Sequence, residues 1–129
     1  MKGAAGVLLL VLWSPLAAAP GSWQSPLAEL RLAVAGRFYH SEPATAPPAA
    51  MGATVVRVGW RYRLPAGRRV QAWLCQGGQC LPLGSARRGR FLAPPEWRVS
   101  RPLRLRFRLP AGERRAVTVG TPRLTVEYR

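Results

Sequence analysis

Apolar and charged residues alternate one by one along most of this chain. The clearest case is the segment 103–109, in which Leu103, Leu105 and Phe107 alternate with arginines. A period of two places the apolar residues on one face of a β-strand and the charged residues on the other. Beyond the N-terminal segment, no stretch repeats its apolar residues at the three- and four-residue spacing of an amphipathic helix. The pattern therefore predicts an all-β fold.

The alternating stretches are short, and turns rich in proline and glycine separate them. They predict strands at about 27–35, 55–63, 70–76, 80–83, 91–93, 103–109, 117–119 and 124–128. We expect the Pro- and Ala-rich segment Ser41–Gly52 to be a connecting loop and the basic segment Gly84–Arg90 to be turn-like. Pro82 cannot donate a ladder hydrogen bond, so its strand should lie or end at an edge. Seven or eight such strands in a small domain are typical of a small antiparallel β-sandwich or a small barrel, and we favour the sandwich.

One short sequence occurs twice. Arg63–Gly67 and Arg108–Gly112 both read Arg-Leu-Pro-Ala-Gly, and each follows an alternating strand. A duplicated half-domain is one explanation. Shared turn chemistry is the simpler one, because proline fixes φ and glycine accepts a positive φ.

The N-terminal segment has the features of an export signal. Lys2 provides positive charge, residues 7–13 form an apolar core, and Ala17–Ala19 supply the small residues that cleavage needs. The predicted organisation is a signal peptide over residues 1–19, cut at 18–21, and one domain over residues 20–129. The alternative is an uncleaved N-terminal anchor. The apolar core is too short to span a bilayer and no second long apolar run follows, so we expect a soluble, exported mature chain.

The chain has two cysteines, Cys75 and Cys80, which enclose the sequence Gln-Gly-Gly-Gln. In an exported chain such a pair is expected to form a disulfide. Four residues between the cysteines suit a longer hairpin loop better than a two-residue one. Closing so short a loop stabilises the fold by about 2 kcal/mol, so the fold must depend mainly on its core.

The charge is strongly unbalanced. The chain has nineteen arginines, one lysine, five glutamates and no aspartate, for a net charge of +15. Such an excess indicates an anionic partner: nucleic acid, lipopolysaccharide, anionic lipid or an acidic protein. A GC-rich genome is the alternative explanation, because Arg, Ala, Pro and Gly share GC-rich codons. Export argues against nucleic acid as the natural ligand.

Arginines mark one face of two predicted strands. Within 55–63, the alternation predicts Val56, Val58, Trp60 and Tyr62 on one face, with Val55 and the arginines on the other. Within 103–109, the arginines lie about 7 Å apart along one face. The two sets form a broad cationic face if the strands are neighbours; the alternative is a solvated outer face. Trp73 shares its face with Cys75 and packs on the disulfide or on a partner. The candidate interaction surface is Arg57, Arg61, Arg104, Arg106, Arg108 and Trp73, and Arg63 lies beside Arg57 and Arg61 on the cationic face.

Catalytic constellations are missing from the sequence. The single histidine, His40, has no aspartate to complete a triad, and the mature chain has no lysine for a Schiff base. His40 and the two cysteines lack zinc-site spacing, and the five glutamates are scattered singly. The sequence therefore predicts a protein that is not an enzyme, with no catalytic residue, no metal and no cofactor.

Five segments in order carry a family resemblance. They are Gly21–Gln24, Val58–Tyr62, Leu74–Cys80, Pro102–Leu105 and Thr125–Arg129. In this order and spacing the chain resembles the flagellar FlhE family. The resemblance implies a small periplasmic all-β protein that is accessory to the flagellum and has an intramolecular disulfide between Cys75 and Cys80. It also implies one of two roles: guarding the flagellar export gate, or acting as a periplasmic chaperone against premature assembly.

Two hypotheses of function follow. The first is a periplasmic protein that binds a flagellar structural or export protein by surface recognition, capping an exposed strand edge or apolar surface on it. Residues 70–76 or 123–128 are its candidate edge strands. The second is an envelope module that binds lipopolysaccharide or anionic lipid through its arginine faces.

Overall fold

The computed structural model describes residues 3, 6 and 21–129. The predicted signal peptide and its cleavage region lie outside the described residues, apart from these two isolated glycines. The described secondary structure is β1 (Gly21–Pro26), β2 (Leu30–Leu32), β3 (Phe38–His40), the 3-10 helix η1 (Pro48–Ala50), β4 (Val55–Arg63), β5 (Gln71–Gln76), β6 (Gln79–Pro82), β7 (Arg88–Leu92), β8 (Leu103–Arg108) and β9 (Val117–Tyr128). Among these residues, no helix has the length and apolar character needed to cross a bilayer.

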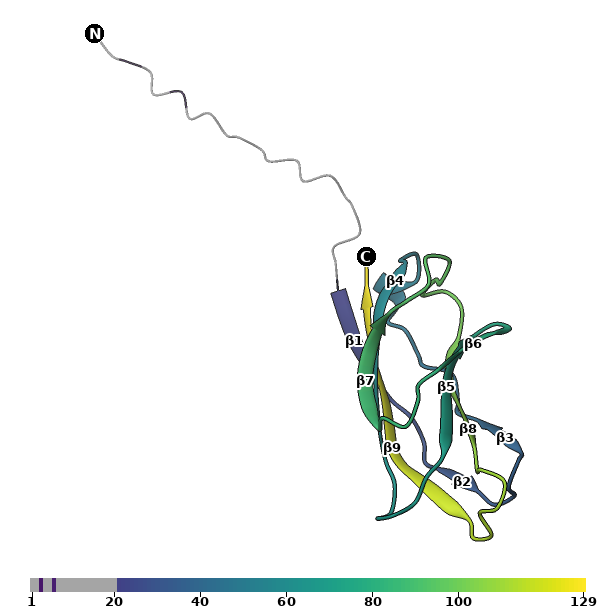
Figure 1. Cartoon of the computed structure of the whole chain (residues 1–129). Coiled ribbons are helices and arrows are strands. Elements are labelled where there is room, and N and C mark those ends of the chain that lie inside the picture. The colour runs from purple at the N-terminus through teal and green to yellow at the C-terminus, as the bar shows by residue number, and fades with distance from the viewer. Residues whose placement is uncertain (1–2, 4–5, 7–20) are drawn as a thin grey trace.

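The strands form two antiparallel sheets. A five-stranded sheet has the order β1-β9-β4-β7, with β2 pairing with another part of β9, and a four-stranded sheet has the order β3-β8-β5-β6. Figure 1 shows the sheets as two layers, with β7 and β9 in one and β5 and β8 in the other. The small antiparallel β-sandwich that the sequence predicts is therefore confirmed.

Strict alternation puts the core between the sheets. Leu103, Leu105 and Phe107 of β8 are buried, whereas the arginines between them point outward. The inward residues of β9 meet them from the other sheet: Val117, Val119, Leu124 and Val126. Each fully buried Leu or Phe side chain stabilises the fold by about 1.5–3 kcal/mol relative to exposure, so these two strands supply much of the core.

The predicted strand at 27–35 is wrong in its bounds. The chain instead forms β1 before it, the three-residue β2 within it, and β3 after it. β1 shows little alternation in the sequence, but it pairs with β9 along its whole length and its Trp23 packs on Tyr128 at 5.6 Å between ring centroids. Tertiary pairing therefore creates strands here that local sequence does not specify.

β4 departs from the predicted alternation near both ends. Its register with β9 shifts between Val55 and Arg57 and again between Arg61 and Arg63. Val55, predicted to face outward, is buried together with Val58, because an extra residue at such an irregularity changes the face on which the neighbouring side chains lie. Between the shifts the prediction holds, and Arg57 and Arg61 lie on the outer face.

The strand edges differ from the candidates that the sequence suggested. The segments 70–76 and 123–128 belong to β5 and β9, and both strands lie inside their sheets, so neither is a free edge. Apolar strands of this kind are normally covered on both sides, whereas exposed edges are short or charged. β6, which ends at Pro82, is an edge strand as predicted. The segment 84–90 is only partly a turn, because β7 begins at Arg88.

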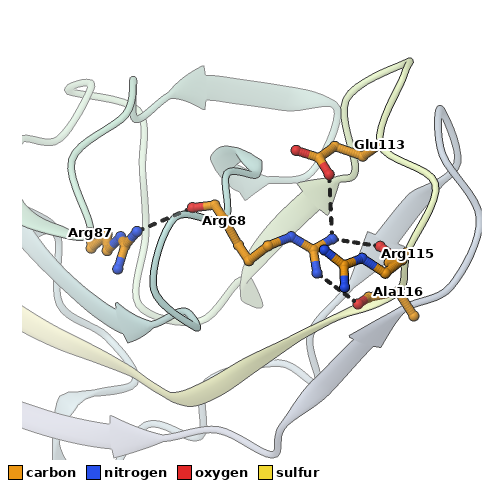
Figure 2. A network of polar contacts seen from close by, with 5 residues as sticks. All are labelled: Arg68, Arg87, Glu113, Arg115 and Ala116. Atoms are coloured by element: carbon orange, nitrogen blue, oxygen red, sulfur yellow. Dashed lines mark hydrogen bonds and ion pairs between the residues drawn. The ribbon is translucent and has the colours of Figure 1, made fainter.

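The duplicated Arg-Leu-Pro-Ala-Gly sequence forms the same turn twice, each where the chain crosses between sheets. Gly67 and Gly112 have φ of 75° and 100°, and the residue after each glycine, Arg68 or Glu113, donates its N–H to the turn proline at 3.2 or 3.1 Å. The side chains of Arg68 and Glu113 then form an ion pair at 3.4 Å, and Arg68 also donates to the carbonyl of Arg115 at 2.6 Å (Figure 2). The explanation by turn chemistry accounts for the repeat.

Candidate functional site

The outer face of the five-stranded sheet has an arginine-lined hollow, here called the arginine groove. The middle row of this face crosses Gln24, Thr125, Gly59 and Arg90, which pair across four adjacent strands. Residues two positions away on the same strands flank this row. The charged lining of the groove consists of Arg57, Arg61, Arg88, Arg90, Arg123 and Glu127.

A glycine forms the floor of the arginine groove. Gly59 has no side chain, whereas Arg57 and Arg61 rise on either side of it along β4. A Cβ atom added at Gly59 would lie 3.5 Å from the nearest heavy atom, the carbonyl oxygen of Gly89, so a small side chain would fit there in ordinary van der Waals contact. The hollow has a volume of about 540 Å³. It can therefore accept side chains of a partner between the arginines.

The charge of the arginine groove is largely uncompensated. Arg57 pairs with Glu127 at 3.3 Å, and Arg123 donates to the Gln24 carboxamide at 3.4 Å. In the described part of the chain, no carboxylate lies within ion-pair distance of the other arginines of the groove. Both members of the Arg57–Glu127 pair are about 40% exposed (41% and 42%), and such surface pairs contribute little to stability. The groove thus attracts anionic groups, and the attraction weakens with salt.

The outer face of the four-stranded sheet carries a different feature, here called the arginine–aromatic cluster: Phe38, Trp73, Arg106 and Arg108. Phe38 and Trp73 meet edge to face at 5.5 Å between ring centroids. The Arg106 guanidinium lies 4.2 Å from the Phe38 centroid and 4.6 Å from that of Trp73, and Arg108 lies at 4.9 and 5.3 Å. Cation–π contacts of this kind attract the guanidinium groups to the faces of the rings.

The predicted surface residues divide between these two faces. Arg104, Arg106, Arg108 and Trp73 share the outer face of the four-stranded sheet, whereas Arg57, Arg61 and Arg63 belong to β4 in the other sheet. β4 and β8 are not neighbours, so the single broad cationic face does not form. Alternation predicts which residues point outward, but it does not say which sheet a strand joins.

Several site residues were missed by reasoning from the sequence. The sequence predicts a turn-like segment at Arg88 and Arg90, although their alternation with Gly89 and Phe91 is the pattern of a strand. For Arg123 it predicts only a place in a candidate edge strand. Phe38 was missed because β3 is three residues long. In each case the signal was period-two alternation over a segment too short to be decisive alone.

The Cys75–Cys80 pair forms the predicted disulfide across the β5–β6 hairpin. The loop is the two-residue turn Gly77-Gly78, not the longer loop expected, and Gly77 has φ of 59°, as a type II′ turn requires of its first central residue. The two glutamines that flank this turn bind a neighbouring segment. Gln79 accepts a hydrogen bond from the indole of the buried Trp97 at 2.9 Å.

Gln76, the other glutamine, is buried and its carboxamide is fully used. Its oxygen accepts from the Arg98 N–H at 3.0 Å, and its nitrogen donates to the carbonyls of Arg98 and Arg101 at 2.7 and 3.3 Å. The Cys-Gln-Gly-Gly-Gln-Cys sequence is thus a disulfide-closed hairpin attached to the segment before β8. Its role is structural, because these bonds hold the β5–β6 end of the four-stranded sheet against residues 98–101.

One ionisable group in residues 21–129, the Tyr62 hydroxyl, has a shifted pKa. Among the described residues, no three His, Cys, Asp or Glu side chains lie together in a way that could hold a metal ion. Burial raises the pKa of the Tyr62 hydroxyl, and the Arg87 guanidinium opposes the rise. Tyr62 packs inside the sandwich against Phe107 at 5.2 Å between ring centroids, so this shift belongs to the core. What the two outer faces offer chemically is binding of anionic groups.

Comparison with known proteins decides the family. The family model described as "Flagellar protein FlhE" matches residues 29–129, which includes every strand from β2 to β9. The chain belongs to the FlhE family. A crystal structure of FLHE is similar to the chain with a TM-score of 0.68 and 28% sequence identity, over 85% of this chain and 97% of that one. No curated protein matches the chain.

The FlhE assignment confirms the resemblance read from the ordered segments of the sequence. It places the chain among flagellar proteins, with an accessory role in the flagellum. The structural match covers almost all of the FLHE chain, so the sandwich described above is the fold that the two share.

Proposed function

We propose that this FlhE protein works in the periplasm, where it binds a flagellar structural or export protein by surface recognition and without catalysis. In this proposal residues 1–19 are the signal peptide and the sandwich is the exported domain. The family supports the flagellar partner. The observation that carries the mode of binding is the arginine groove, an open hollow of about 540 Å³ with five arginines and one glutamate.

Two roles fit such a protein. A guard binds the export apparatus and limits leakage through it, whereas a chaperone binds rod or filament subunits and prevents their assembly in the periplasm. We favour the chaperone-like role, because an acidic extended segment fits an open cationic groove beside a strand edge. The two roles predict different captured partners.

The test is crosslinking and capture in the periplasm with the mature protein, washed at low and at high salt, followed by identification of the bound species. Capture of rod or filament subunits supports the chaperone-like role, and capture of export-gate components supports the guard. A variant with Gln at Arg57, Arg61 and Arg123 should capture less of the same partner. A matched variant with Gln at Arg31, Arg101 and Arg114, which loses the same charge at exposed positions elsewhere, should capture as much as the wild type.

The second candidate function is binding of lipopolysaccharide or anionic lipid. It is favoured by one observation, the arginines of β8 on the outer face of the four-stranded sheet. Binding to vesicles that contain lipopolysaccharide tests it directly. Charge-driven binding should be lost at high salt, whatever the vesicle composition, because salt screens exposed charges. If Gln at Arg104, Arg106 and Arg108 leaves vesicle binding unchanged, this candidate fails.

A further inference from the structure

We propose that an extended acidic segment of the flagellar partner adds as a new strand to the free edge of β7, beside the arginine groove. This inference rests on the proposed function and specifies its site and the chemistry of its ligand. It depends on three features of β7: a free backbone edge, arginines on one face, and an exposed apolar residue at the end of the strand.

The first feature is the free backbone edge. Among the described strands, β7 pairs only with β4, and none of them pairs with its other side. The amide of Ala93 donates to a β4 carbonyl at 2.8 Å, and the carbonyl of Arg87 accepts from a β4 amide at 2.9 Å. Backbone groups alternate in direction along an antiparallel strand, so those of Arg88, Arg90 and Leu92 point away from β4. These residues offer a partner strand unused donors and acceptors.

The second feature is the charge beside that edge. Arg88 and Arg90 lie on the outer face and belong to the lining of the arginine groove. Side chains directly opposite each other on paired antiparallel strands lie about 4.5–5.5 Å apart. Acidic residues at alternate positions of an added strand would therefore meet these guanidinium groups. Leu92, which is 68% exposed, gives the same strand an apolar contact.

The other edges of the sandwich are poorer candidates. β1 and β6 both end in proline, and β2 and β3 have three residues each. Pairing of β7 with a second copy of itself is also disfavoured, because two such strands would bring their arginines together and like charges oppose pairing. The charge that protects this edge against self-association selects for an acidic strand.

The test uses two synthetic peptides and the mature protein. The probe is a capped seven-residue peptide with Glu at alternate positions and Val between them; its control has Lys in place of Glu. Binding is followed by fluorescence polarisation. We expect the Glu peptide to bind, the Lys peptide not to bind, and the affinity to fall with salt, because exposed charge contacts are screened.

Two variants separate the backbone from the charge. Leu92→Pro removes a free N–H while keeping every arginine and the bonds to β4, and proline is tolerated on such an edge. It should weaken binding about tenfold, which corresponds to ~1.4 kcal/mol. R88Q/R90Q should weaken binding about tenfold at low salt and much less at high salt. R31Q/R101Q, with the same loss of charge at exposed positions outside the arginine groove, should change it less than about twofold.

An additional probe does not depend on how the variants fold. The same Glu peptide with N-methyl groups on its Glu residues keeps its charge, but it cannot donate hydrogen bonds to β7 while its Glu side chains lie opposite Arg88 and Arg90, so it should not bind the wild-type protein. Equal binding of the methylated peptide, or full binding by Leu92→Pro, overturns strand addition. If Leu92→Pro captures the same flagellar proteins as the wild type, this inference is wrong while the proposed function stands. If the wild type captures no flagellar protein, the proposed function fails, whatever the peptides do.

Discussion

Replacement of Gln76 by Met tests whether the hairpin attachment stabilises the fold. Methionine keeps the length of the side chain but makes none of the three hydrogen bonds of the carboxamide. Gln76 is only 5% exposed, so water cannot replace its bonds fully. A buried polar group left without a partner costs about 1–3 kcal/mol, and the apolar methionine recovers part of this by burial. We expect a net loss of about 2 kcal/mol in the free energy of unfolding.

The assay is urea unfolding followed by tryptophan fluorescence, with the disulfide kept oxidised. The matched control is Gln71→Met in the same strand, because Gln71 is exposed and its side chain bonds, among the described residues, only to the Arg108 guanidinium, at 2.6 Å. The control should lose less than about 0.5 kcal/mol, as most surface substitutions do. A Gln76→Met protein as stable as the control would refute the idea that this attachment holds the hairpin in place.

Three further predictions concern the core and the disulfide. Gly89→Ala should destabilise the fold by about 1–3 kcal/mol, because its Cβ would lie 2.6 Å from the Trp60 ring, whereas Gly59→Ala should stay within about 0.5 kcal/mol; equal unfolding curves would contradict this. Tyr62 should form tyrosinate only above its ordinary pKa of 10.0. Its contribution to the free energy of unfolding is complete below that pH and should be lost as the pH rises through the folded pKa. An alkaline absorbance titration that Tyr62→Phe leaves unchanged would contradict this. Unreduced periplasmic protein should show no free thiol, and reduction should lower stability by about 2 kcal/mol; a count of two thiols contradicts the pairing.

The sequence predicts the architecture well because alternation is a local property. Leu105 and Phe107 must share a face whatever lies opposite them, and that face becomes the core. The short strands are less predictable. β3 is held by pairing with β8, a partner more than sixty residues away in the chain, and no local pattern specifies such pairing.

The candidate site was predicted only in part, for a physical reason. The outward direction of Arg57, Arg61 and Arg106 follows from period two, but their grouping follows from strand order. The arginine groove needs β1, β9, β4 and β7 side by side, which brings residues such as Gln24 and Arg123 together from opposite ends of the chain. An extra residue at a bulge, as near Val55, also moves the neighbouring side chains to the other face of the strand, and the residue types give no sign of it.

The central place of β9 has a consequence for the order in which this protein is made. β9 pairs with β1 and β2 on one side and with β4 on the other, and it is the last of these strands to leave the ribosome. Until β9 emerges, the five-stranded sheet lacks the strand that joins β1 and β2 to β4, and the apolar faces of the earlier strands are not covered by a complete sandwich. The five-stranded sheet can therefore close only after β9 has been made, and the strands that precede it in the chain cannot complete the sheet by themselves.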